Sequence, residues 1–298
     1  MPTIDPKNTP TADVHQFLLG AVSPRPIAFA STIDETGKAN LAPYSFFNCF
    51  SSNPPIVVFS SNRKVSDNTT KDTLHNIEKT KEVVINVVNY QIVRQMAVTS
   101  IAYPADVSEF EKAGLTPIPS DLVSPFRVKE SPAQLECKVK DIIALGDQGG
   151  AGHLIICEVL RMHIDDAVLD EKGKIDPHKI DLMGRMGRAF YVRASGAAIH
   201  KIFQPVTQLG IGFDQLPASV RNSRILSGND LGQLAALTAL PNSEAIEKIK
   251  TEDPKVQAIL AKKNPSLALH QYAKEMLTTE EDQRNYALAL AIIADQIN

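Results

Sequence analysis

Hydrophobic and polar positions alternate through the first two thirds of the chain, which predicts a sheet of many strands. Residues 26–33 and 39–47 read as two strands separated by a turn at 34–37, and a third apolar run follows the prolines at 54–55. In the first strand bulky residues alternate with small ones, so one of its faces allows another group to pack closely. This spacing predicts a β-meander over residues 23–63.

Longer runs continue the sheet. Residues 83–88 (VVINVV) are almost continuously apolar, which is typical of a strand buried on both faces. Residues 135–145 and 153–164 alternate over long stretches and are joined by GDQGGAG, which predicts a hairpin. No helix is expected after these glycines, so they do not fit a dinucleotide-binding fingerprint. About eight strands in mainly antiparallel order favour a closed or nearly closed barrel. The helical segments expected beside it are residues 11–19, 73–80 and 92–100.

A proline-rich stretch, residues 103–132, interrupts the alternation, with one helical turn near 108–112. Long loops in compact domains are often lids or binding loops, and a strap that covers a sheet edge is the plainer alternative. The sequence leaves both interpretations open.

From about residue 200 the pattern becomes irregular and then helical. Leucines recur at helical spacing behind Asn229 or Asp230, and Pro254 and Pro265 each follow a capping residue. Thr278 and Glu281 form a capping-box pattern before a last helix. The chain is therefore predicted to divide into a barrel domain, residues 1–198, and an extension made of a strap and helices, residues 199–298.

Composition and charge exclude several classes of function. The 31 Lys+Arg and 34 Asp+Glu residues give a net charge of -3 without a basic run, which argues against a nucleic-acid partner. No stretch approaches the roughly 18 to 20 apolar residues of a membrane helix, and the N-terminus lacks the pattern of a secretory signal. We therefore expect a cytoplasmic protein with no membrane partner.

Cysteine and histidine spacing does not predict a metal site. Cys49, Cys137 and Cys157 lack CxxC spacing and are expected to be reduced apolar residues. Strand parity places His153, Cys157 and His163 on one face, but they spread over about 33 Å at roughly 3.3 Å per residue. Nucleophile-elbow, P-loop and HExxH motifs are absent as well, so hydrolase and kinase functions have no support.

Several segments in order resemble the flavin reductase-like family of FMN-binding split barrels, over about residues 12–195. They are residues 23–62, KDTLHNI (71–77), VVINVV (83–88), PAQLEC (132–137) and HLIICEVLRMHI (153–164). The resemblance implies a mainly β, α+β fold: an antiparallel split β-barrel with flanking helices, followed here by the C-terminal strap and helical extension. It also implies FMN as cofactor and a homodimer whose subunits share cofactor contacts.

The phosphate of FMN needs different binding groups from those that suit its ribityl chain and its ring. The phosphate candidates are Arg63, Lys71 and Thr73 at the start of a predicted helix, because cations and a helix N-terminus form an anion site. The plainer alternative is that Thr70 or Asp72 only caps this helix while Lys71 is solvated.

The ring and the ribityl chain are expected to meet main-chain groups and short side chains. The candidates are Asn40, Ala42, Ser45, Phe46, Phe47, Asn48, Ser60 and Ser61. At least one of the two phenylalanines is expected in the core, because neighbouring strand residues point to opposite faces. Arg25, between two prolines, is a candidate to reach the flavin or a carboxylate. Arg185 lies in LMGRMGR, which resembles the segment where the chain of this family returns to the cofactor. The alternative is a surface arginine in a tight turn.

The resemblance implies an oxidoreductase of the flavin reductase type. NAD(P)H, as co-substrate, would transfer hydride to the flavin, and electrons would pass to a partner monooxygenase through a diffusing flavin or to another acceptor. One alternative is a flavoredoxin-like FMN electron-transfer protein without direct NAD(P)H use, and another is a non-catalytic flavin-binding protein. No catalytic acid or base is predicted, because the cofactor performs the difficult step. The extension is expected to lie on the barrel or the partner subunit and to narrow access to the flavin.

Overall fold

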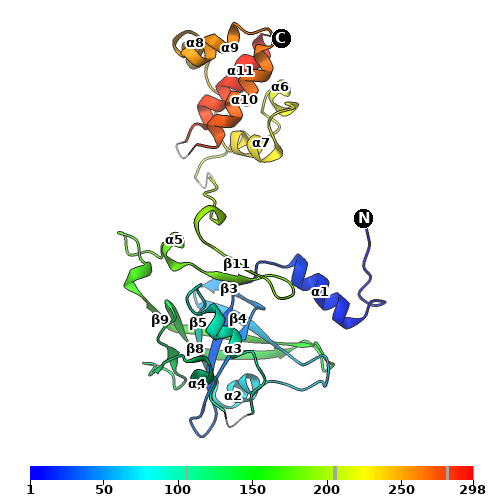
Figure 1. The fold of residues 1–298 in the computed structure, drawn as a ribbon, viewed down its shortest axis with the longest axis vertical. Coiled ribbons are helices and arrows are strands. Elements are labelled where there is room, and N and C mark those ends of the chain that lie inside the picture. Colours follow the sequence, from blue (N-terminus) through cyan, green and yellow to red (C-terminus); the bar gives the residue numbers. More distant parts are fainter. Residues whose placement is uncertain (105–106, 204–206, 280–281, 298) are drawn as a thin grey trace. The chain divides into compact units, whose positions relative to one another are not determined.

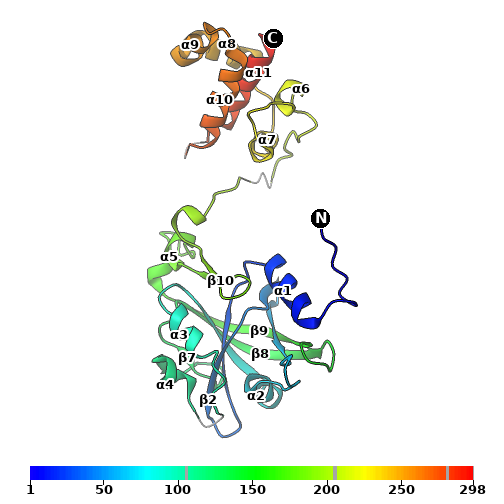
Figure 2. The ribbon, with the colours of Figure 1, turned by 45° about the vertical axis from the view of Figure 1, so that its right-hand side comes forward.

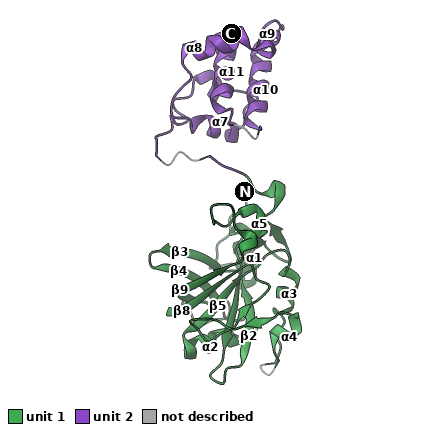
Figure 3. Ribbon diagram, turned by 90° about the vertical axis from the view of Figure 1, so that its left-hand side faces the viewer, with its two compact units in different colours: residues 1–200 green, residues 201–298 purple. Residues whose placement is uncertain are grey.

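A computed structural model describes residues 1–104, 107–203, 207–279 and 282–297 of the chain. The chain forms two compact units, Met1–His200 and Lys201–Asn298, which Figure 3 shows in different colours. The N-terminal unit is built on strands and the C-terminal unit on helices. In the described residues, no helix is long and apolar enough to cross a membrane.

A seven-stranded antiparallel sheet forms the N-terminal unit (Figure 1). Its strand order is β2-β1-β5-β8-β9-β4-β3. Its strands are β1 (Ala28–Ile33), β2 (Ala39–Tyr44), β3 (Phe47–Ser52), β4 (Pro55–Asn62), β5 (Glu82–Val87), β8 (Ala133–Ala144) and β9 (Gly152–Ile164). Two small sheets pair β6 (Pro117–Ile118) with β7 (Arg127–Val128) and β10 (Met183–Arg185) with β11 (Tyr191–Arg193). The predicted antiparallel α+β architecture and the hairpin around GDQGGAG are confirmed.

The predicted strand over residues 39–47 is in fact two strands. The chain leaves β2 after Tyr44, turns at Ser45 and Phe46, and enters β3 at the opposite edge of the sheet. β2 nevertheless lies close to β4, so the sheet curls towards closure. The predicted meander is therefore wrong, because the corner carries the same alternation of polar and apolar residues as a continuous strand.

Of the five helices described in this unit, α2 (Asp72–Thr80) packs on one side of the sheet, and α3 (Val93–Val98) and α4 (Glu109–Ala113) pack on the other. The remaining helices are α1 (Thr11–Ala21) and α5 (Pro177–Ile180), with 3-10 turns at Asp166–Val168 and Gly196–Ala198. Ala28 and Ala30 of β1 face a core that includes Leu74 of α2, and Phe29 faces a second core with Phe110 of α4. The small face of the first strand is thus the face on which α2 packs, as the alternation indicated.

The proline-rich stretch is a strap in its described part. The Val128 N–H donates to Asn86 Oδ1 at 2.9 Å, and the N–H groups of Asp121 and Leu122 donate to the Glu136 carboxylate. These bonds hold the strap against β5 and β8. Residues 105–106 of the stretch lie outside the described residues.

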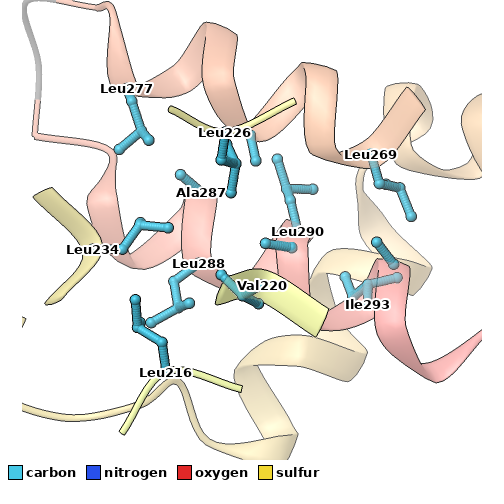
Figure 4. Close-up of a cluster of buried hydrophobic side chains, with 14 of the residues drawn as sticks. Leu216, Val220, Leu226, Leu234, Leu269, Leu277, Ala287, Leu288, Leu290 and Ile293 are labelled. Carbon is cyan, nitrogen blue, oxygen red and sulfur yellow. The ribbon is translucent and has the colours of Figure 1, made fainter. Parts of the chain in front are cut away.

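The C-terminal unit is a helical bundle around a leucine- and alanine-rich core (Figure 4). Its helices are α6 (Ala218–Arg221), α7 (Gly228–Ala235), α8 (Ser243–Glu252), α9 (Pro254–Leu260), α10 (Pro265–Leu277) and α11 (Arg284–Gln296). Asp253 caps α9 as predicted, whereas Ser227, in a capping box with Asp230, caps α7. Thr278 ends α10 instead of capping the last helix, so that prediction is wrong; Glu281 lies outside the described residues.

Candidate functional site

Helix α2 begins without a side-chain cap. Its N-cap residue is Lys71, and no side chain among the described residues caps the first turn. The first N–H groups of a helix have no intrahelical partner and carry a partial positive charge. Thr70, one of the two predicted caps, pairs instead with His75 Nε2 at 2.6 Å, and Asp72 is already inside the helix. Neither predicted cap is therefore formed, whereas Lys71 is exposed, as that alternative expected.

Lys71 adds a full positive charge at this helix end. Its Nζ lies 4.8 Å from the centre of the Tyr44 ring, although much of the side chain remains exposed. Burial of the ammonium lowers the pKa of Lys71, and the nearby charge of Lys64 lowers it further. Two neighbouring cations beside an uncapped helix N-terminus favour an anion.

A network of amides and hydroxyls fixes Thr73 in the first turn of α2. Asn40 Nδ2 donates to Thr73 Oγ1 at 2.9 Å and to Thr32 Oγ1 at 3.1 Å. Asn76 Nδ2 also donates to Thr32 Oγ1 at 3.1 Å. The network joins β1, β2 and α2, so it sets the position of the helix N-terminus relative to the sheet.

Two buried hydroxyls beside this network lack a hydrogen-bond partner in the described part of the chain. Tyr44 is 5% exposed and Ser61 is 1% exposed, and neither Tyr44 Oη nor Ser61 Oγ has a partner of normal geometry. Burial raises the pKa of Tyr44 to about 12, although the hydroxyls of Thr73 and Ser61 lie near enough to lower it. An unsatisfied buried hydroxyl costs about 1 to 3 kcal/mol, so both groups would gain from a bound molecule.

The corner between β2 and β3 carries several of the predicted ring contacts. Phe47 packs against the barrel core, together with Ala42, and Phe46 lies edge-on to His15 of α1 with ring centres 6.2 Å apart. Asn48 is exposed and its Oδ1 accepts the Cys49 N–H. Phe47 thus packs on the core, as predicted for at least one of the two phenylalanines, and Phe46 contacts α1.

Ser60 and Arg63 form hydrogen bonds with residues close to them in the chain. Ser60 Oγ donates to Asn62 Oδ1 at 2.8 Å. Arg63 donates from Nε and Nη2 to the side chain and the carbonyl of Asn68, at 2.6 and 2.8 Å. Arg63 therefore fixes the loop that leads into Lys71.

Arg25 is 5% exposed and joins three parts of the fold. Its Nη1 donates to the carbonyls of Leu19 and Val22 at 2.7 Å each, and Nη2 donates to the Met186 carbonyl at 3.0 Å. Its Nε reaches Ser45 Oγ at 3.4 Å. The acceptors are carbonyls and a hydroxyl, and no carboxylate pairs with it among the described residues. Burial lowers the pKa of Arg25, and the charge of Arg185 adds to this effect.

Arg185 lies on β10 beside Arg25. The backbones of the two arginines form a bridge, and the Arg185 guanidinium lies 4.5 Å from the centre of the Tyr191 ring. Its Nη1 also donates to the Phe190 carbonyl at 3.3 Å. Arg185 is thus near the β2–β3 corner through Arg25, while Asn40, Ser61, Lys71 and Thr73 gather at α2.

Tyr44 and Lys64 belong to this region and were not among the predicted site residues. Tyr44 lies in the predicted strand 39–47, where an aromatic ring at an inward position is typical of core. Only the unpartnered hydroxyl distinguishes it, and that depends on the folded structure.

A second polar cluster surrounds Glu136, which is fully buried. Acidic and histidine ligand atoms of Asp121, Glu136 and His163 lie within 4.8 Å of one another. However, Arg161 pairs with Asp121 at 2.6 Å and Arg127 lies 3.9 Å from Glu136. The arginines supply the positive charge that a metal ion would otherwise bring, so the cluster is explained by its ion pairs.

His153, Cys157 and His163 are separated, as their spacing predicted. His153 Nδ1 lies 3.1 Å from the Ser61 carbonyl, Cys157 is in the barrel core, and His163 Nε2 is 2.7 Å from Glu136. The prediction that all three share one face is wrong. A bulge in β9 between Val159 and Arg161 reverses the side-chain alternation before His163.

Comparisons with known proteins agree with this fold and site. A family model described as the flavin reductase like domain matches residues 20–179. An uncharacterized protein of Aquifex aeolicus is 40% identical over 197 residues, which cover 66% of this chain and 97% of that protein.

Three solved structures share the fold of the N-terminal unit. Nitrilotriacetate monooxygenase component B from Bacillus cereus has 30% identity and a TM-score of 0.62, covering 69% of this chain and 98% of its own. The 2-nitrobenzoate 2-nitroreductase NbaA of Pseudomonas fluorescens has 26% identity and a TM-score of 0.62, with 71% and 100% coverage. A split barrel domain protein from Shewanella frigidimarina has 25% identity and a TM-score of 0.59, with 69% and 100% coverage. The chain therefore belongs to the flavin reductase-like family of flavin-binding oxidoreductases.

Proposed function

We propose that the chain is an FMN-dependent oxidoreductase of the flavin reductase type, which takes reducing equivalents from NAD(P)H and delivers them to a second acceptor. One observation carries the proposal. The buried hydroxyls of Tyr44 and Ser61 lack partners at the place where Lys71 and the uncapped N-terminus of α2 supply positive charge. Hydroxyl groups and an anion are what the ribityl phosphate of FMN presents.

The residues present fit the chemistry of FMN. Lys71, Thr73 and the first N–H groups of α2 would hold the phosphate. Tyr44 and Ser61 would hydrogen-bond the ribityl chain, and the β2–β3 corner, residues 45–48, would meet the ring, with Asn40, Ala42 and Ser60 around them. When bound, FMN supplies a group that accepts a hydride and passes electrons on.

The protein's own contribution is to fix these groups before the cofactor binds. The Asn40–Thr32–Asn76 network holds Thr73, the Arg63–Asn68 pair holds the loop before Lys71, and Arg25 holds Ser45. Side chains locked in this way lose little freedom on binding. A direct contact of Arg25 or Arg185 with the cofactor rests on the family resemblance alone.

We propose a cytoplasmic homodimer with a small-molecule or protein electron acceptor. Exposed apolar side chains on the sheet, among them Phe50, Leu160 and Met162, support a covered surface. The names of the B. cereus and P. fluorescens proteins, a monooxygenase component and a nitroreductase, support delivery of electrons to a second acceptor. The barrel domain, residues 1–198, would carry this chemistry, and the extension, residues 199–298, would narrow access to the cofactor.

Steady-state oxidation of NADH and of NADPH by FMN-loaded protein tests the activity. We expect turnover with at least one nucleotide, and Lys71→Gln should need more FMN to reach the same rate. FMN binding without turnover on either nucleotide would reject the reductase and leave the flavoredoxin-like carrier. If a chain truncated after residue 197 turns over identically, the proposed role of the extension is rejected.

A further inference from the structure

A cavity of about 570 Å³ lies between α1 and the connection of the β10–β11 hairpin. It is lined by Thr9 and, from α1, Asp13, Gln16, Phe17 and Gly20, and by Gly187 and Arg188 of the hairpin. None of these residues belongs to the proposed FMN site. Pockets of roughly 300 to 1,000 Å³ are the size that binds small organic molecules.

The helix and the hairpin hold the two walls of this cavity in place. The α1 residues that line it recur every three or four positions, so they form one face of the helix. The hairpin approaches the helix at Gly187, where an added Cβ would lie 3.5 Å from Gly20 Cα. Arg25 joins both walls, because its guanidinium bonds carbonyls at the end of α1 and the Met186 carbonyl of the hairpin. Figures 1 and 2 show α1 beside this hairpin.

The two walls carry complementary chemistry. Arg188 has a φ of +56°, a backbone conformation that non-glycine residues rarely adopt, and it lines the hairpin side. Asp13 and Gln16 line the helix side with the Phe17 ring, which is 53% exposed. In the described ranges the guanidinium of Arg188, the carboxylate of Asp13 and the amide of Gln16 have no protein partner. All of these side chains are exposed, so an accessible cation lies on the hairpin side of the cavity, and an accessible carboxylate and an aromatic ring lie on the helix side.

We propose that this cavity binds a small planar organic acid, an aromatic ring that carries one acid group and one hydrogen-bond donor, as in a hydroxybenzoate. Arg188 pairs with the acid group, and the planar guanidinium matches the geometry of a carboxylate. Asp13 accepts the hydrogen bond from the donor group, and Phe17 lies against the ring. The ligand needs both groups, because a molecule with only the acid leaves Asp13 without a ligand contact, and one with only the donor leaves Arg188 without one.

Calorimetric titration of the full-length, FMN-loaded protein tests the ligand class. The probes are the three hydroxybenzoate isomers, benzoate, phenol and adenosine monophosphate. We expect at least one isomer to bind, with benzoate and phenol about tenfold weaker or more, since each lacks a hydrogen bond to a charged group. Tighter binding of adenosine monophosphate than of every isomer would overturn the proposal, and so would the failure of all three isomers to bind.

The variant Arg188→Gly tests the site. Glycine adopts the left-handed backbone freely, so the fold is retained and the melting temperature should not fall. Loss of the guanidinium should weaken the best isomer about tenfold or more, while Arg94→Gln, an exposed arginine on α3, should leave it unchanged. FMN affinity should be equal in all three proteins, which separates this test from the proposed FMN site. Equal isomer binding by wild type and Arg188→Gly would overturn the assignment.

Discussion

Two polar clusters in the N-terminal unit each contain buried side chains and differ in how those side chains are paired. At Glu136, the carboxylate accepts the N–H groups of Asp121 and Leu122 at 2.8 and 2.6 Å and lies 2.7 Å from His163 Nε2. At the start of α2, the hydroxyls of Tyr44 and Ser61 have no partner in the described residues. The first cluster is complete within the protein, whereas the second keeps two buried hydroxyls without a partner among the described residues.

The paired cluster at Glu136 should matter for the stability of the fold, and the unpaired cluster at α2 for ligand binding. A buried charge that has all its hydrogen-bond partners is compatible with a stable fold. Removing one partner leaves a buried group unsatisfied, and its desolvation cost then lowers the free energy of unfolding. A buried group without a partner lowers stability until a ligand satisfies it. Substitutions in the two clusters should therefore change different measured quantities.

The largest effect is expected for Glu136→Gln. The substitution removes the negative charge that three donors share, and the new amide places an NH₂ group against one of these donors. The free energy of unfolding should therefore fall by about 3 kcal/mol. Urea denaturation measures this, with exposed Glu171→Gln as the control. An unchanged free energy of unfolding, or a large loss of FMN affinity, would show that the Glu136 cluster is not the purely structural one.

Lys71→Gln should have the opposite pattern. Loss of a charged hydrogen bond to the phosphate should weaken FMN binding about tenfold or more, while the free energy of unfolding without FMN stays within about 0.5 kcal/mol. Fluorescence titration gives the affinity. Lys79→Gln, at the other end of the same helix, is the matched control. Equal losses in both variants would point to general electrostatics instead of a phosphate contact.

Tyr44→Phe removes one of the unpartnered hydroxyls and should change stability and FMN affinity in opposite directions. The protein without FMN should become more stable by about 1 kcal/mol, because a buried unsatisfied group is lost, and FMN should bind about fivefold less tightly. Thermal unfolding with and without FMN measures both changes, with exposed Tyr90→Phe as control. A fall in stability without FMN would mean that the hydroxyl already has a partner.

The smallest effect concerns pH. Burial by itself would raise the pKa of Glu136, but the N–H donors of Asp121 and Leu122 and the contact with His163 outweigh it and hold the pKa below its usual value of 4.5. The carboxylate therefore stabilises the fold fully above pH 4.5 and loses this contribution as the pH falls through the lower, folded value. The difference in melting temperature between wild type and Glu136→Gln should be constant down to this range and shrink below it. A difference that shrinks already near neutral pH would contradict the direction of the shift.

Much of the barrel could be predicted from the sequence, because strand alternation reports which face of each strand is buried. The corner at Ser45 and Phe46 could not, since the alternation runs on through it while the chain crosses to the far edge of the sheet. The bulge before Arg161 was hidden for a similar reason: one extra residue in β9 leaves the pattern locally intact and reverses the face of His163.

The candidate site was predictable in part. Asn40, Ser61, Lys71 and Thr73 lie together at the start of α2, and their proximity was predictable because strand ends and a helix start are visible in sequence; their contact with FMN stays a prediction. The bonds of Arg25 to three main-chain carbonyls were not predictable, since backbone acceptors carry no sequence signal. The same holds for Tyr44, whose role depends on the absence of a partner in the folded structure.

The most direct test of FMN binding at α2 is a titration of the purified protein with FMN and, separately, with riboflavin, which lacks the phosphate. We predict that FMN binds at least about tenfold more tightly, the value of a charged contact, and that Lys71→Gln reduces this preference. Equal affinity for the two flavins, or no uptake of FMN, would contradict a phosphate site formed by Lys71, Thr73 and the N-terminus of α2.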